Sequence, residues 1–165
     1  MIEKDLEIID DFLDQDYFDH LKKDIESNNF PWAFQRDVAI ADEDLDNQFY
    51  FVHRLYENFV PESSFFDQIR PLTDELGAVA LIRARILMYV NQGTQYVHQR
   101  HIDKPYPHTA ALLYINECNG FTEFDDGTRV DNKENRLVRF DGSILHSSST
   151  CTDQKNRLVL SINYF

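Results

Sequence analysis

Three residues in the second half of the chain have the types needed to bind a transition metal. His101 and Asp103 are separated by one residue, and His146 follows in the segment FDGSILHSSS. Two imidazoles and one carboxylate can occupy one face of an octahedral Fe(II) ion and leave the other positions for a co-substrate and dioxygen. The H-x-D pair alone is weak evidence, because pairs of this kind arise by chance in a chain with many acidic residues. The metal-site hypothesis therefore depends on the surrounding sequence.

Arg157 is a further residue whose side chain could take part in the chemistry of the predicted metal site. It follows His146 on the closing segment, which begins NRLVLS. A dicarboxylate that binds a metal through one end needs a fixed cation for its other end, and the guanidinium offers two parallel N–H donors to a carboxylate. Arg157 is therefore a candidate for binding the far end of such a co-substrate.

The elements that must position these residues are short strands. From Leu81 onward, segments with apolar residues at alternate positions are separated by the turn sequences NQG, NG, DDG and DG. This pattern predicts antiparallel β-structure, and five or more such strands favour a sandwich or double-sheet jelly roll. The predicted strands lie in LIRARILMY, QYVHQRHI, TAALLYIN, GFTEF, NRLVRF and RLVLSINYF.

The first half of the chain has helical patterns instead. Apolar residues recur at helical spacing from Asp14 to Asn28 and from Ser64 to Leu76, and Pro71 must kink or divide the second helix. The segment from Phe30 to Gln48 is expected to be a loop. We therefore predict an α+β, mainly β fold in one domain of residues 1–165. In it, helices and loops of about residues 1–78 pack on one sheet of a double-stranded β-helix (jelly-roll) core of about residues 80–165.

The composition of the chain indicates which classes of binding partner are unfavourable. The chain has 165 residues and a formal net charge of −13, which disfavours binding to nucleic acid. Its acidic start lacks the features of a signal peptide, and no segment has the roughly 18 apolar residues of a membrane span. We expect a soluble, cytoplasmic protein in which Cys118 and Cys151 are reduced thiols. The sequence gives no indication of the oligomeric state.

With these motifs in place, the chain resembles the Fe(II)- and 2-oxoglutarate-dependent oxygenases, in particular the branch of the prolyl 4-hydroxylases and hypoxia-factor prolyl hydroxylases. The resemblance spans roughly Ile82 to Phe165 and depends on the order and spacing of its motifs. These are Tyr89-Val-Asn-Gln-Gly-Thr-Gln-Tyr96, His101 and Asp103, Tyr114-Ile115-Asn116, NGFTEF, FDG before His146, and Arg157 with Ser161 four residues later.

The resemblance implies an activity and roles for individual residues. It implies that His101, Asp103 and His146 bind Fe(II), and that 2-oxoglutarate and dioxygen are consumed to hydroxylate an unactivated C–H bond, with release of succinate and CO2. It also raises the question of a requirement for ascorbate. The residues that it assigns to the co-substrate are Arg157, Tyr114, Tyr89 and Ser161.

Two positions that contact the prolyl substrate in this family carry other residues here. An arginine near the start of the TAALLYIN strand is replaced by Pro107 or His108, and a tryptophan near the end of the last strand is replaced by Asn163. The substrate to be oxidised is therefore left open between a peptide, prolyl or not, and a small molecule. Its candidate contacts are Arg85, Tyr96 and His108.

Other readings of the same residues remain. The histidines and Asp103 could serve only as hydrogen-bonding groups of a structural jelly roll, or the chain could be a cupin-like metal-binding or isomerase module that uses no 2-oxoglutarate. Arg157 and Tyr114 argue against the cupin-like reading. The presence of Asp103, rather than Ala or Gly, argues against a halogenase, because the metal then has no free position for a halide.

Strand alternation also predicts which arginines face the pocket. Ile82, Ala84, Ile86 and Met88 form one apolar face of the strand from Leu81 to Tyr89, so Arg83 and Arg85 share the opposite face with Tyr89. The window from Leu81 to His108 has four basic residues and one acidic residue, a net charge of +3. These arginines could pair with acidic residues of the helices, or they could form a positive entrance that selects an anionic substrate.

Overall fold

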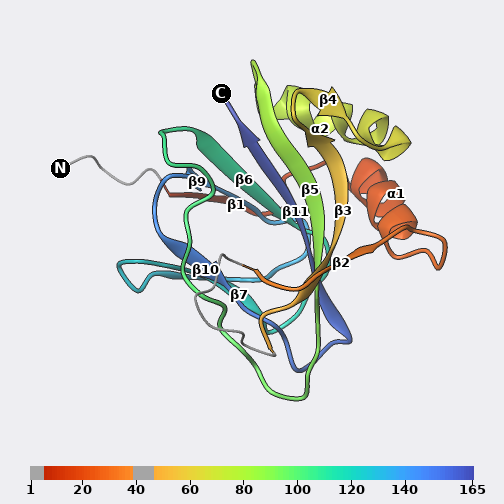
Figure 1. The fold of residues 1–165 in the computed structure, drawn as a ribbon. Coiled ribbons are helices and arrows are strands. Elements are labelled where there is room, and N and C mark those ends of the chain that lie inside the picture. Colours follow the sequence, from red (N-terminus) through yellow and green to blue (C-terminus); the bar gives the residue numbers. More distant parts are fainter. Residues whose placement is uncertain (1–5, 39–46) are drawn as a thin grey trace.

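The structure, a computed structural model, describes residues 6–38 and 47–165 and is mostly β-structure (Figure 1). In chain order the elements are β1 (Glu7–Ile9), α1 (Gln15–Ile25), β2 (Ala33–Gln35), β3 (Tyr50–Glu57), β4 (Val60–Pro61), the 3-10 helix η1 (Ser64–Ile69), α2 (Arg70–Glu75), β5 (Leu81–Val90), β6 (Thr109–Tyr114), β7 (Phe121–Phe124), β8 (Arg129–Asp131), β9 (Leu137–Asp141), β10 (His146–Ser148) and β11 (Asn156–Tyr164).

Within the described residues these strands form two antiparallel sheets. The larger sheet has the order β1-β9-β6-β11-β5-β3-β2, with β4 paired to β3, and the smaller has the order β10-β7-β8. The segment 97–101 runs antiparallel beside β10 through two isolated bridges, Val97 to Ser149 and His101 to His146. The jelly-roll core that the sequence predicts is confirmed.

The helices cover the outer face of the larger sheet, on the side away from β7 and β10 (Figure 1). Helix α1 begins after Asp14, whose side chain accepts a hydrogen bond from the backbone N–H of Tyr17. Its apolar residues Phe18, Leu21 and Ile25 are almost fully buried against the sheet. In the described part of the chain, no helix is both long and apolar enough to cross a membrane.

Alternation along the central strands separates two apolar cores. On β11, Leu158, Leu160 and Ile162 face the helices, whereas Val159 faces the smaller sheet. Strand β5 follows the same rule, since Ile86 belongs to the helix-side core and Leu87 to the core between the sheets. The site described below lies on this second, inner side.

The first half differs from the expectation of mostly helical structure. It contributes four strands, and β3 pairs with β5 while β1 pairs with β9, so this part extends the larger sheet. The expected loop of residues 30–48 contains β2, and its residues 39–46 lie outside the described part. His53 lies on β3. Its buried ring bonds to the carbonyl of Pro31 and the hydroxyl of Ser63.

One predicted helix and one predicted strand differ in detail from the elements observed. The predicted helix of residues 64–76 is divided into η1 and α2 next to Pro71, as the proline required. The predicted strand QYVHQRHI is not a continuous strand. It forms only the two isolated bridges, Val97 to Ser149 and His101 to His146. Mixed polar and apolar residues without strict alternation explain why sequence patterns describe this segment poorly.

Packing of α1 against the sheet predicts a large effect of one substitution. Phe18→Ala removes a fully buried ring and should lower the free energy of unfolding by about 3–5 kcal/mol, measured by denaturant unfolding. Lys23→Ala, on the exposed face of the same helix, should change it by less than about 0.5 kcal/mol. Equal effects of the two substitutions would show that α1 does not depend on this packing.

Candidate metal and co-substrate site

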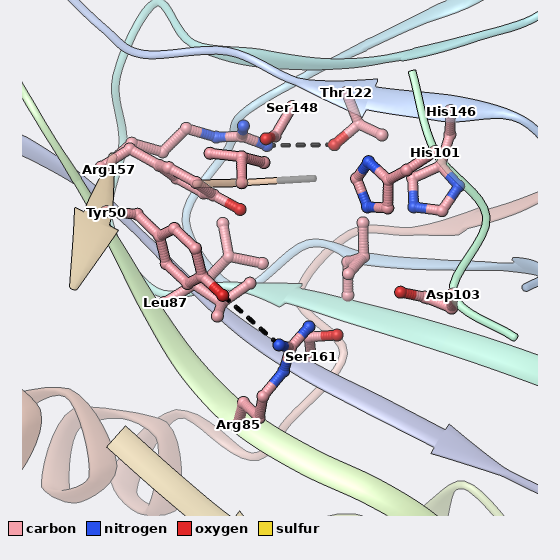
Figure 2. Close-up of a pocket in the computed structure, with 14 residues that line it drawn as sticks. Tyr50, Arg85, Leu87, His101, Asp103, Thr122, His146, Ser148, Arg157 and Ser161 are labelled. Atoms are coloured by element: carbon pink, nitrogen blue, oxygen red, sulfur yellow. Dashed lines mark hydrogen bonds between the residues drawn. The ribbon is translucent and has the colours of Figure 1, made fainter. Parts of the chain in front are cut away.

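A pocket between the two sheets brings together most of the predicted functional residues (Figure 2). It contains about 500 Å³ of space free of protein atoms, part of which is open to solvent. The larger sheet contributes its floor and the smaller sheet its opposite wall. The lining residues include Tyr50, Arg85, Leu87, Tyr89, His101, Asp103, Thr122, His146, Ser148, Arg157, Val159 and Ser161.

Backbone pairing sets the two histidines side by side. The N–H of His101 donates to the carbonyl of His146 at 2.9 Å, and the N–H of His146 donates to the carbonyl of His101 at 3.0 Å. With Asp103, the two side chains present ligand atoms that all lie within 4.8 Å of one another. The three predicted metal ligands therefore converge on one point, which is the first requirement of a metal site.

The hydrogen bonds of the two rings also suit metal binding. Nδ1 of His101 lies 3.3 Å from the carbonyl oxygen of Gln99, and Nδ1 of His146 lies 3.0 Å from that of Ile144. A carbonyl oxygen can only accept, so each Nδ1 carries the proton and each Nε2 keeps a free lone pair. This is the tautomer that a metal-binding histidine needs.

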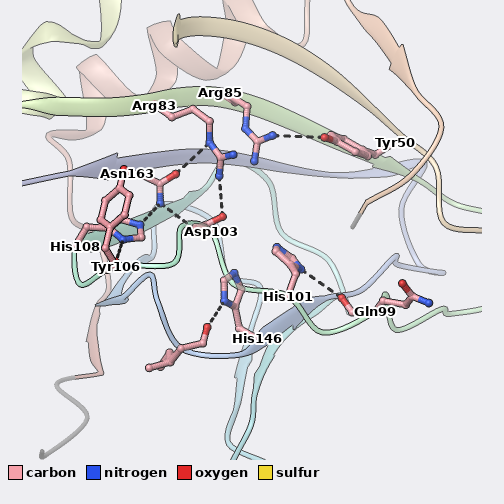
Figure 3. A network of polar contacts seen from close by, with 11 residues as sticks. Tyr50, Arg83, Arg85, Gln99, His101, Asp103, Tyr106, His108, His146 and Asn163 are labelled. Carbon is pink, nitrogen blue, oxygen red and sulfur yellow. Dashed lines mark hydrogen bonds and ion pairs between the residues drawn. The ribbon is translucent and has the colours of Figure 1, made fainter. Parts of the chain in front are cut away.

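Asp103 is held by polar side chains of β5 and β11 (Figure 3). Arg83 Nη2 donates to Oδ1 at 2.8 Å, and Asn163 Nδ2 donates to Oδ2 at 2.8 Å. Each carboxylate oxygen has a second lone pair, so these bonds leave room for a metal. The Asn163 amide also lies 3.2 Å from His108 Nε2. Gly142 permits this arrangement, since a Cβ there would lie 2.2 Å from His108 Nε2.

The charge states of the ligands follow from burial and neighbours. Burial and the nearby His146 lower the pKa of His101 to about 4, so its imidazole is neutral at pH 7. Burial alone would raise the pKa of Asp103, but Arg83, His146 and the bond from Asn163 outweigh it and lower that pKa to about 2. A neutral imidazole and an ionised carboxylate are the forms that bind a metal.

Arg157 lies at another end of the pocket, away from the histidines (Figure 2). It is fully buried, and three of its five N–H groups bond to Asn132 Oδ1, the Ser149 carbonyl and Thr122 Oγ1 at 2.9–3.1 Å. One N–H therefore remains on each terminal nitrogen. Gly120 lets the side chain pass, since a Cβ there would lie 2.6 Å from Arg157 Cδ. The guanidinium is thus fixed in place with donors to spare for a carboxylate.

The other predicted co-substrate residues lie near Arg157 or on the pocket floor. Tyr89 and Ser161 line the pocket, and Tyr89 lies under the Arg157 guanidinium, 5.8 Å from ring centroid to Cζ. The Tyr114 hydroxyl donates to Thr122 Oγ1 at 2.8 Å and is not among the groups that line the pocket. Thr122, which accepts from both Tyr114 and Arg157, is the group that does line it. A role for Tyr114 in binding the co-substrate stays a prediction.

The three candidate substrate contacts have different positions. Arg85 lines the pocket, as strand alternation predicts. Tyr96 is partly buried outside the lining, and His108 lies behind Asp103 and Asn163. A contact of Tyr96 or His108 with substrate stays a prediction. Arg83 pairs with Asp103 rather than with an acidic residue of the helices.

Several pocket residues were not found from the sequence. Tyr50 lies on β3, a strand that the sequence analysis missed, and Thr122 and Ser148 are small hydroxyl residues without a distinguishing motif. The structure also brings Cys118 and Cys151, both free and buried, together with Asp153, with ligand atoms within 4.8 Å of one another. Their separation in the sequence gave no sign of this contact.

Comparison with known proteins agrees with this architecture. No protein-family model and no curated protein sequence matches the chain. Among solved structures, a prolyl-4-hydroxylase from Pseudomonas putida matches with a TM-score of 0.68 at 16% identity, over 98% of this chain and 93% of that chain. The chain has the fold of the prolyl 4-hydroxylases and related 2-oxoglutarate oxygenases.

Two further structures mark the range of that fold. The viral collagen prolyl hydroxylase from Paramecium Bursaria Chlorella virus-1, solved as its 2-oxoglutarate complex, matches with a TM-score of 0.62 at 15% identity, over 98% of this chain and 96% of that chain. SnoN, a non-heme α-ketoglutarate-dependent epimerase of nogalamycin biosynthesis, matches with a TM-score of 0.68 at 12% identity, over 98% and 78%. The same fold thus serves more than one reaction, and the reaction of this chain must be argued from its own site.

The metal site makes a direct prediction. His101→Ala, Asp103→Ala and His146→Ala should each weaken Fe(II) binding by at least about tenfold, because a three-ligand site loses its geometry with any member. Anaerobic calorimetry measures the affinity, and His20→Ala, an exposed histidine on α1, is the control. A variant that binds Fe(II) as the wild type does would remove that residue from the ligand set.

Arg157 makes a separate prediction. Arg157→Met should raise the concentration of 2-oxoglutarate needed for half-saturation by at least about tenfold, because each charge-assisted hydrogen bond contributes about 1.5–3 kcal/mol. Tyr114→Phe should act more weakly in the same direction, through the loss of its bond to Thr122. The matched control is Arg129→Met, which removes an exposed guanidinium. Unchanged half-saturation in a folded Arg157→Met protein would contradict the assignment.

Proposed function

We propose that this protein is an Fe(II)- and 2-oxoglutarate-dependent dioxygenase that hydroxylates an unactivated C–H bond of a peptide, prolyl or not, or of a small molecule. The observation that supports the proposal is the combination in one pocket of three convergent metal ligands and a buried arginine that lines the same pocket. A cupin-like module without a co-substrate would need the first feature but not the second.

The ligands fit Fe(II) in number, type and protonation. His101 and His146 would each bind it through Nε2, and Asp103 through a carboxylate oxygen. When bound, the metal would supply the activation of dioxygen that couples oxidative decarboxylation of 2-oxoglutarate to oxidation of the substrate C–H bond. Oxygen balance follows, since one atom of dioxygen enters succinate and the other enters the hydroxylated product, with CO2 as the third product.

Other residues of the site would position the co-substrate and the metal ligands. Arg157 and Thr122 would bind the far carboxylate of 2-oxoglutarate. This contact would orient the long axis of the co-substrate along the floor of the pocket. Leu87 and Val159 form an apolar stretch of that floor, suited to the methylene groups of the co-substrate. Arg83 and Asn163 keep Asp103 ionised and oriented, so that its carboxylate does not need to reorganise during turnover.

A turnover screen tests this proposal. The protein is supplied with Fe(II), 2-oxoglutarate and ¹⁸O-labelled dioxygen, together with panels of prolyl peptides, free amino acids and other metabolites. We expect succinate that carries one labelled oxygen, and an increase in its rate with the correct substrate. Asp103→Ala is the inactive control. Succinate formation no faster than in Asp103→Ala, with every panel and without substrate, would refute the dioxygenase and favour the cupin-like alternative.

A further inference from the structure

Arg85 occupies a defined place on the floor of the pocket. Strands β3, β5 and β11 lie side by side, and their register aligns residues in rows that face the smaller sheet. One row contains Tyr89 and Arg157, the next Val52, Leu87 and Val159, and the third Arg54, Arg85 and Ser161. The floor therefore presents a cation, then an apolar row, then a second cationic row.

The second cationic row has an unbalanced charge. Arg54 contacts Glu57 at 3.5 Å, and Arg83, next along β5, contacts Asp103 at 2.8 Å. Among the residues that the structure describes, no carboxylate lies within 4.0 Å of the Arg85 guanidinium. Arg54 and Arg85 are also direct cross-strand neighbours, an arrangement of like charges that destabilises a sheet. The Arg85 charge helps to lower the pKa of Asp103, but that carboxylate pairs directly with Arg83, so Arg85 has no ion-pair partner of its own among the described residues.

The hydrogen-bonding groups of Arg85 are also largely unused. Its Nε is buried and has no hydrogen-bond partner, and its Nη1 makes one long contact of 3.5 Å with the Tyr50 hydroxyl (Figure 3). A buried donor without a partner is unfavourable, and more so when it is charged. The contacts within the folded chain therefore do not account for an arginine at this position. A ligand that supplies negative charge and hydrogen-bond acceptors would account for it.

Arg85 and Arg157 are too far apart to serve one small carboxylate. Ser161, the β11 neighbour of Arg85, lies four residues beyond Arg157, which is about 13 Å along an extended strand. The apolar row of Leu87 and Val159 lies between them. Figure 2 shows the two guanidinium groups on different sides of the pocket, with Asp103 nearer to Arg85. If Arg157 binds the co-substrate, Arg85 is available to a second molecule close to the metal ligands.

We propose that Arg85, with the hydroxyls of Tyr50 and Ser161 beside it, binds a carboxylate group of the substrate that is oxidised. The proposal rests on the dioxygenase function proposed above and specifies the chemical class of its substrate. The planar guanidinium matches a planar carboxylate through two parallel hydrogen bonds, and the hydroxyls supply further donors. The carboxylate belongs to a free organic or amino acid, or to an acidic side chain of a peptide.

Binding of matched acids and amides tests this proposal. The protein is loaded anaerobically with Fe(II) and saturating 2-oxoglutarate, so that the metal and Arg157 are occupied. Calorimetry then measures the binding of acetate against acetamide, and of acetyl-Gly-Glu-Gly-amide against the same peptide with Gln in place of Glu. Inorganic phosphate is a third probe. The two pairs distinguish a free acid from an acidic side chain as the source of the carboxylate.

We expect at least one carboxylate to bind at least tenfold more tightly than its amide. Arg85→Met should abolish this preference, and Arg85→Lys should restore only part of it, because an ammonium cannot form the fork. Arg70→Met, which removes an exposed guanidinium on α2, should bind the probes as the wild type does. The melting temperature of Arg85→Met should equal or exceed that of the wild type, since the substitution removes an uncompensated charge.

Other results would overturn the proposal. These are equal affinity for acid and amide, a stronger preference for phosphate, an unchanged preference in Arg85→Met, and a loss of 2-oxoglutarate affinity in Arg85→Met as large as that in Arg157→Met. Failure of the wild type to bind Fe(II) and 2-oxoglutarate is a distinct outcome. It would refute the dioxygenase function itself, and the inference with it.

Discussion

The alternation of side chains along β5 and β11 is the constraint on which the rest of the structure depends. Every second residue of β11 points away from the helices, which places Arg157, Val159, Ser161 and Asn163 in one line on the inner side. This line runs from the Arg157 end of the pocket to Asn163, which bonds to the carboxylate of Asp103. A shift of register by one residue would exchange these groups for leucine and isoleucine and would remove both the arginine and the asparagine from the site.

The same constraint explains how buried charge is tolerated. Arg157 is fully buried, but Asn132, Ser149 and Thr122 satisfy three of its donors, and the rings of Tyr89 and Tyr114 lie against it. Arg83 is largely buried and pairs with Asp103. Arg85 alone of these three has no such partner among the described residues. The contrast is between two arginines whose charges are compensated by neighbouring groups and one, Arg85, whose Nε has no hydrogen-bond partner.

Sequence patterns predicted the parts of this site that lie on regular strands or in short motifs. The alternation around Arg85 required only local regularity, whereas His101, Asp103 and His146 were connected through the resemblance to a known family, and the structure brings these residues into one pocket. The sequence could not predict Tyr50, because β3 lacks strict alternation and the first half was expected to be helical. It could not predict the Asp103 network either, since Arg83 and Asn163 are far from Asp103 and from each other in sequence and come together only through sheet pairing.

The proposed function requires metal and co-substrate to occupy this pocket in one orientation. The most direct test is a crystal structure of the protein with Mn(II) and 2-oxoglutarate, grown without oxygen, in which Mn(II) replaces Fe(II). We expect the ion between His101, Asp103 and His146, and the far carboxylate of 2-oxoglutarate on Arg157. An ion bound instead at Cys118, Cys151 and Asp153, or a far carboxylate on Arg85, would contradict it.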